Sequence, residues 1–155
     1  MSDSLVIIPT YNERENIAAI IEKVFSLKSS FHILVLDDNS PDQTGIIVKS
    51  LMKDHADRLF LVERSEKAGL GTAYLSGFKW ALERGYSYVF EMDADFSHNP
   101  DDLERLYEAC HTAGADLAIG SRYISGINVI NWPLKRVLMS YFASVFVRKV
   151  TGMSI

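Results

Sequence analysis

The chain has 155 residues, a length that fits one domain with a substantial core. Hydrophobic residues make up 48% of it and charged residues 23%, the balance of an ordinary soluble globular protein. A net charge of −4 argues against a broad nucleic-acid surface, and the single cysteine, Cys110, excludes an internal disulfide. We expect no signal peptide, since no basic region precedes the first apolar run, and no stretch reaches the ~18 uncharged apolar residues of a membrane span.

The apolar pattern alternates between short runs and helical spacing along most of the chain. Short apolar runs predict five strands, at residues 5–9, 32–37, 59–62, 88–93 and 116–120. Apolar residues at helical spacing predict a helix after each of the first four strands: one from about residue 13, one marked by residues 47–52, one over residues 71–85 and one from about residue 99. Strands that alternate with helices in this way form a mostly parallel sheet with helices on both faces, so the predicted fold class is α/β.

Polar side chains gather where the predicted strands end. Ligands of open parallel α/β sheets bind beyond the carboxyl ends of the strands, so we expect a binding site along this edge. The residues at the five strand ends are Pro9, Thr10, Tyr11, Asn12 and Glu13; Asp37, Asp38, Asn39 and Ser40; Arg64, Lys67, Gly69 and Gly71; Asp93 and Asp95; and Gly120, Ser121 and Arg122.

Asp93 and Asp95 form a D-x-D pair directly after the fourth strand. Carboxylates are hard oxygen ligands that suit Mg²⁺ or Mn²⁺, and such a metal offsets the charge of a leaving diphosphate. The D-x-D pattern recurs by chance in many sequences. Its position at the end of a strand therefore supports a metal site more than the pattern alone does. Glu91, on the strand itself, has two open interpretations: a direct role, or a buried carboxylate paired with a nearby base.

Two further segments follow strand ends. In "DDNSPDQT", Asp37 and Asp38 can accept hydrogen bonds from a ribose or a base. Residues such as Ser40, Pro41 and Asp42 build turns unaided, so a purely structural role stays open for them. The Gly-rich "EKAGLGTA" opens a helix and is similar to an anion cradle. It is not a Walker A motif, and no G-x-G-x-x-G follows the first strand, which disfavours ATPase and dinucleotide-binding functions.

Five segments occur together in the order of one known family. They are "PTYNE", "DDNSPD", "KAGLGTAYLSGF", "MDADFSH" and "GSRY". In order and approximate spacing the chain resembles the polyprenol (dolichol) phosphate mannose synthases of glycosyltransferase family 2, which have the Rossmann-like GT-A fold. The first segment alone indicates only the broad family, whereas "DADFSH" followed by "GSRY" is more specific.

The resemblance implies an inverting transfer of mannose from GDP-mannose to a polyprenyl phosphate (dolichyl or undecaprenyl), giving polyprenyl-phosphomannose and GDP. Asp93 and Asp95 would hold Mg²⁺ or Mn²⁺, and Asp95 and Arg122 would be catalytic. The acceptor phosphate would contact Arg122, Arg136 and Ser140. The residues implied to bind the nucleotide sugar are Pro9, Tyr11, Glu13, Asp37, Asp38, Asp93, Ala94, Asp95 and Arg122.

The resemblance also implies a division of the chain. Residues 1–126 would form the GT-A domain that binds the nucleotide sugar, and residues 127–155 would begin the segment that faces the acceptor and the membrane. The apolar and basic segment from Trp132 to Val150 is typical of an amphipathic helix at a membrane surface, or of one packed on this domain or a partner chain. The implied location is cytoplasmic, peripheral on the cytoplasmic face of a membrane, with no nucleic-acid partner.

The chain departs from the family pattern at two places. Gln43 stands where the family usually has Gly, which should alter a turn without abolishing the site. The family also continues beyond the point where this chain stops, so we expect a truncated protein that lacks a C-terminal region or relies on a membrane-anchoring partner. Two alternatives therefore stay open: a family 2 enzyme that uses UDP-glucose or another nucleotide sugar, and an inactive module that only binds a nucleotide sugar.

Overall fold

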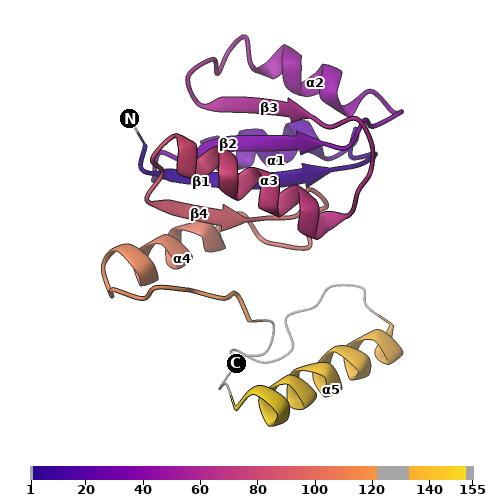
Figure 1. Ribbon diagram of the computed structural model, residues 1–155, viewed down its shortest axis with the longest axis vertical. Coiled ribbons are helices and arrows are strands. Elements are labelled where there is room, and N and C mark those ends of the chain that lie inside the picture. The colour runs from indigo at the N-terminus through magenta and orange to yellow at the C-terminus, as the bar shows by residue number, and fades with distance from the viewer. Residues whose placement is uncertain (1, 122–132, 153–155) are drawn as a thin grey trace. The chain divides into compact units, whose positions relative to one another are not determined.

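The computed structural model describes residues 2–121 and 133–152 of the chain. The chain divides into two compact units, Met1–Asp116 and Leu117–Ile155. The first unit holds a sheet and the helices that cover it, and the second holds one long helix (Figure 1).

Four strands form the sheet: β1 (Ser4–Thr10), β2 (His32–Asp37), β3 (Leu59–Glu63) and β4 (Tyr88–Glu91). Their pairings are all parallel, and they lie in the order β3-β2-β1-β4. Because parallel strands run the same way, their carboxyl ends share one edge of the sheet (Figure 1). The predicted α/β class with a parallel sheet is confirmed.

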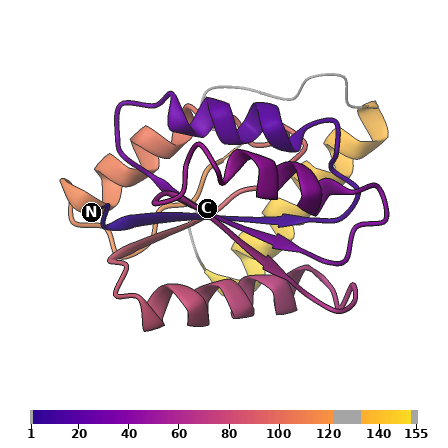
Figure 2. The ribbon, with the colours of Figure 1, turned by 90° about the horizontal axis from the view of Figure 1, so that it is seen from above.

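Helices cover both faces of this sheet, as the sequence predicts. The helices α1 (Ile17–Phe25), α2 (Thr44–Leu51) and α4 (Asp102–His111) lie on one face, and α3 (Leu70–Glu83) lies on the other (Figure 2). Successive side chains of a strand point to opposite faces, so β1 supplies an apolar layer to each side. The side chains of Val6 and Ile8 enter the larger core, and those of Leu5 and Ile7 pack toward α3.

The expected fifth strand is absent from the part of the chain that the structure describes. Residues 116–120 have no regular structure, and Leu117 and Ile119 are 72% and 57% exposed. A short apolar run becomes a strand only when a neighbouring strand completes its hydrogen bonds. No described strand pairs with this run, so its apolar alternation alone was an insufficient signal.

The second unit contains α5 (Leu134–Thr151), which confirms the predicted C-terminal helix. None of its side chains is buried within the described residues. Among the helices that the structure describes, none combines the length and apolar character needed to cross a membrane.

Gly77 allows α3 to approach β1 closely. A Cβ built on Gly77 would lie 2.7 Å from Cδ1 and 2.9 Å from Cγ2 of Ile7. Ile7 itself is fully buried, so its side chain has little room to move away.

We therefore expect Gly77→Ala to lower the free energy of unfolding by about 1–3 kcal/mol, the usual cost of overpacking a core. The measurement is the midpoint of urea unfolding. Gly71→Ala on the same helix is the control, because a Cβ there meets nothing within 4 Å. Equal losses in the two variants would show that the contact with Ile7 does not limit the packing of α3.

Candidate functional site

The carboxyl edge of the sheet brings together residues from three strand ends. Tyr11 follows β1, Asp38 follows β2, and Asp93 lies two residues beyond the end of β4. All three belong to the first unit, and β1 pairs with both β2 and β4. The predicted nucleotide and metal residues of these strands therefore lie along one edge, whereas Arg122 falls outside the described residues.

Asp37 is buried, and both oxygens of its carboxylate accept hydrogen bonds from the protein. Its Oδ1 accepts hydrogen bonds from the hydroxyls of Thr10, at 3.0 Å, and Ser40, at 2.6 Å. Its Oδ2 accepts the backbone N–H of Ser40 at 3.0 Å. These bonds tie the end of β1 to the turn after β2, so the Asp37 carboxylate shapes the loop directly.

Asp38 forms a bidentate ion pair with Arg64, a residue that the sequence placed on the binding edge without a specific contact. Nε of Arg64 lies 2.5 Å from Oδ1 of Asp38, and Nη2 lies 2.7 Å from Oδ2. The two side chains are only 13% and 9% exposed, and the hydrogen bonds to Asp38 raise the pKa of Arg64 despite its burial. A ribose or base that binds Asp38 must therefore share its carboxylate with Arg64.

Arg64 also reaches the Gly-rich loop before α3. Its Nη1 donates to the Thr72 hydroxyl at 3.0 Å, and that hydroxyl donates to the carbonyl of Gly69 at 2.7 Å. Lys67, between Arg64 and Gly69 in the same loop, places its Nζ 4.0 Å from the ring centroid of Tyr11, a cation–π distance. The loop between β3 and α3 is thus held against both β1 and β2.

The turn after β2 also supports the loop after β1. Asp42 accepts the N–H and the hydroxyl of Thr44 and the backbone N–H of Arg14. Desolvation acts to raise the pKa of Asp42, but this set of hydrogen bonds lowers it overall. The hydroxyl of Thr44 in turn accepts the N–H of Glu13 at 3.1 Å. Gln43, between Asp42 and Thr44, adopts a left-handed backbone with φ of 71°, a conformation that glycine adopts without steric cost. This gives a physical reason for the Gly that the family usually has at this position.

The D-x-D loop is organised by its own residues. The backbone N–H of Asp93 donates to Nδ1 of His98 at 3.2 Å, and Nε2 of His98 lies 3.8 Å from Oδ2 of Asp93. Oδ1 of Asp95 accepts the N–H of Ser97 at 2.9 Å. Partial burial acts to raise the pKa of Asp95, but the hydrogen bonds from Ser97 lower it overall. Phe96, between Asp95 and Ser97, has a left-handed φ of 59° and is 45% exposed.

Glu91 is exposed at the end of β4, so the interpretation of a buried carboxylate paired with a base is wrong. Val89 packs in the core under α3 and Phe90 in the opposite core, which places Glu91 on the α3 side of the sheet. Tyr74 of α3 lies on the same side, and its hydroxyl donates to Oδ1 of Asp93 at 3.5 Å. Burial, and then the charges of Asp93 and Glu91, raise the pKa of Tyr74, so its phenol stays protonated.

The donor set fits a hard divalent cation that a ligand helps to hold. An ionised carboxylate offers about four lone-pair sites, so Asp93 and Asp95 both retain acceptor capacity beyond the contacts above. No cluster of three or more potential His, Cys, Asp or Glu ligands occurs among the described residues. Mg²⁺ is commonly held by one or two carboxylates together with phosphate oxygens and water, which matches this arrangement.

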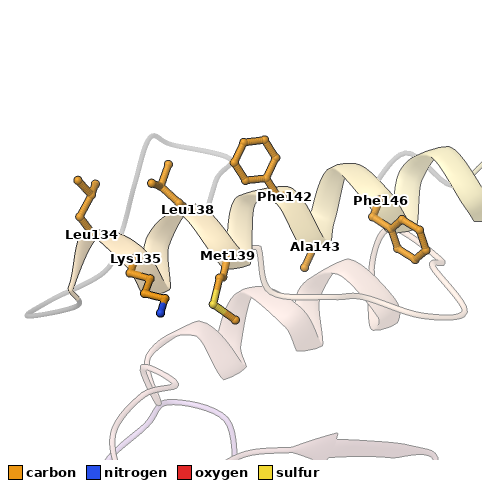
Figure 3. A pocket seen from close by; sticks show the side chains of 7 residues that line it. All are labelled: Leu134, Lys135, Leu138, Met139, Phe142, Ala143 and Phe146. Carbon is orange, nitrogen blue, oxygen red and sulfur yellow. The ribbon is translucent and has the colours of Figure 1, made fainter.

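Two of the three predicted acceptor residues, Arg136 and Ser140, lie in the second unit, on α5. Arg136 and Ser140 are four residues apart on this helix and therefore share one face. A shallow hollow on the surface of α5 has an apolar lining, which Figure 3 shows along the helix. The residues that line it are Leu134, Lys135, Leu138, Met139, Phe142, Ala143 and Phe146.

Comparison with known proteins identifies the family. The family model of Glycosyl transferase family 2 matches residues 5–152. The chain belongs to that family. This membership agrees with the acidic pair at the end of a parallel strand and confirms the resemblance found in the sequence.

Two curated relatives in this family cover nearly the whole chain. The polyprenol monophosphomannose synthase of Mycolicibacterium smegmatis is 52% identical over 98% of the chain, and the undecaprenyl-phosphate mannosyltransferase of Micrococcus luteus is 42% identical over 97%. The chain spans 57% and 61% of the lengths of these two relatives. Among solved structures, TarS of S. aureus matches 72% of this chain and 33% of its own, with 25% identity and a TM-score of 0.50.

The ion pair between Arg64 and Asp38 yields a stability prediction. Arg64→Ala leaves the Asp38 carboxylate buried without its partner, which should lower the free energy of unfolding by about 2–4 kcal/mol. Urea unfolding of the purified variant measures this loss.

Arg105→Ala is the matched control because it removes an arginine from an exposed ion pair with Asp102. Exposed pairs of this kind contribute at most about 1 kcal/mol. If the two variants unfold at the same urea concentration, the buried pair of Arg64 and Asp38 contributes no more to stability than the exposed pair of Arg105 and Asp102.

Proposed function

We propose that the protein is an inverting mannosyltransferase that moves mannose from GDP-mannose to a polyprenyl phosphate, releasing GDP. The observation that carries the proposal is the pair Asp93 and Asp95 at the carboxyl end of β4, in a chain 52% identical to a polyprenol monophosphomannose synthase. Residues 1–126 would bind the donor, and residues 127–155 would begin the side that receives the acceptor.

The donor would lie along the carboxyl edge of the sheet. Tyr11 and Glu13, held by Lys67 and Thr44, would line the nucleoside side together with the carboxylate of Asp38. Pro9 and Asp37 would support this side from the ends of β1 and β2. Asp93 and Asp95, with the buried Ala94 between them, would face the diphosphate. Mg²⁺ or Mn²⁺ bound there would offset the charge of the departing GDP.

The acceptor needs positioning more than activation. A polyprenyl phosphate is already an anion near neutral pH, so the transfer requires no strong general base. The guanidinium of Arg136 offers a planar fork that matches phosphate oxygens, and the hydroxyl of Ser140 lies one helical turn away. In this proposal Arg122 balances charge between the diphosphate and the incoming phosphate.

We further propose that α5 lies at a membrane surface, on the cytoplasmic face that the resemblance implies. Its exposed apolar side chains repeat every four residues, at Leu134, Leu138, Phe142 and Phe146. The helix sequence contains no acidic residue and carries a basic pair near each end, Lys135 with Arg136 and Arg148 with Lys149. Apolar area and positive charge together favour an anionic lipid surface.

A binding experiment tests the donor assignment. Calorimetry should show that GDP binds more tightly than UDP in the presence of Mn²⁺, and that Asp95→Ala removes the dependence of GDP affinity on Mn²⁺. The physical reason is that Asp95 supplies one of the two carboxylates expected on the metal. A preference for UDP would overturn the mannose assignment in favour of a UDP-sugar enzyme of the same family.

Transfer of labelled mannose from GDP-mannose to a polyprenyl phosphate then tests the reaction itself. The assay is run on this chain and on a version extended to the length of its relatives. The extended version should transfer mannose, and Arg136→Ala in it should impair use of the lipid phosphate while GDP affinity is unchanged. Donor binding without transfer by either version would favour a module that only binds the nucleotide sugar.

Vesicle binding tests the membrane proposal. Replacing Arg148 and Lys149 by alanine should weaken binding to phosphatidylglycerol vesicles roughly tenfold or more, since each basic residue near an anionic surface contributes about 1 kcal/mol. Sedimentation with vesicles measures the change. Alanine at Lys53 and Lys79, two exposed lysines of the first unit, removes the same charge and should have little effect. Equal losses would mean that net charge, and not α5, governs binding.

A further inference from the structure

Tyr74 links α3 to the acidic loop after β4. Its hydroxyl donates to Oδ1 of Asp93, a residue 19 positions away in the sequence. Neither the D-x-D pattern nor the Gly-rich segment assigns a role to this tyrosine. The contact matters because Asp93 is half-exposed and its carboxylate would otherwise be oriented by its own short loop alone.

The position of Tyr74 is fixed by the packing of α3. Its ring stacks on Phe78 with centroids 6.4 Å apart, and both rings pack against the core that contains Leu5 and Ile7. One turn away, Gly77 brings the helix close to the side chain of Ile7. The phenol is therefore held by a rigid element, which is the condition for a side chain to orient a neighbouring ligand group.

Asp93 is restrained from a second direction as well. His98 accepts the backbone N–H of Asp93 through Nδ1, and its Nε2 lies 3.8 Å from Oδ2. Tyr74 approaches Oδ1 and His98 approaches Oδ2, so the two contacts limit rotation of the carboxylate. Groups that hydrogen-bond a metal ligand in this way commonly contribute 10–100-fold to metal affinity.

We propose that Tyr74 is a positioning residue that orients the Asp93 carboxylate for the divalent metal and the diphosphate. The inference rests on the proposed function, because it assigns a supporting residue to the same metal site. Tyr74 acts through its hydroxyl, while its ring serves the packing of α3. These two roles can be separated by substitution.

Tyr74→Phe removes the hydroxyl and keeps the ring, so it tests the proposal directly. Calorimetry with GDP is performed once with Mn²⁺ and once with EDTA. We expect GDP affinity with Mn²⁺ to fall about tenfold, as for other groups that support a metal ligand, and GDP affinity with EDTA to stay unchanged. The thermal midpoint of the variant should stay close to that of the unsubstituted protein.

Two further variants serve as controls. Tyr86→Phe removes a hydroxyl that lies 2.6 Å from Nδ1 of His32, in a different part of the sheet, and should leave the Mn²⁺ dependence unchanged. Phe78→Leu loosens the packing beside Tyr74 without touching its hydroxyl. It should lower the thermal midpoint more than it changes the Mn²⁺ dependence.

The inference is overturned if Tyr74→Phe binds GDP with Mn²⁺ as tightly as the unsubstituted protein, or if Phe78→Leu loses the same Mn²⁺ dependence. In both cases the unsubstituted protein still shows metal-dependent GDP binding, and the proposed function stands. If the unsubstituted protein binds GDP equally with Mn²⁺ and with EDTA, the metal site fails, and the inference fails with it.

Discussion

Parallel pairing of β1 with β2 on one side and with β4 on the other is the constraint on which the site depends. The central strand β1 is buried on both faces, with Leu5, Val6, Ile7 and Ile8 all inaccessible to solvent. Such burial fixes the register, since a shift of one residue would exchange the side chains of the two cores. The same register brings the ends of β2 and β4 to one edge, where Asp38 and Asp93 serve the two halves of the proposed donor site.

The periodicity of apolar residues was enough to predict the four strands and the helices, because burial imposes that periodicity on each element. It failed at residues 116–120, where Leu117 and Ile119 alternate as in a strand but no described strand pairs with them. Strand formation depends on a partner, and a local pattern carries no information about that partner. The apolar runs also predict where each strand ends, and the ends of parallel strands share one edge, so the edge that carries the proposed site was predictable as well.

Contacts between distant residues were not predictable from the sequence. The ion pair of Arg64 and Asp38 joins residues 26 positions apart, and the pairing of Tyr74 with Asp93 joins residues 19 apart. Both contacts meet at α3, since Arg64 bonds to Thr72 in its first turn and Tyr74 follows in the next. One helix thus supports the nucleoside side and the metal side of the proposed site. Its Gly-rich start indicated an anion cradle, but neither the glycines nor the apolar pattern indicated these two contacts.

The left-handed backbone at Phe96 has a consequence for how this loop can change over time. A left-handed conformation costs a residue with a Cβ roughly 1–2 kcal/mol, and glycine or asparagine adopts it more readily. Selection for thermal stability alone would therefore favour replacing Phe96, the residue next to Asp95, by glycine or asparagine. Laboratory evolution of this protein should screen for the proposed function at every round, because stability gained at this position is gained within the proposed site.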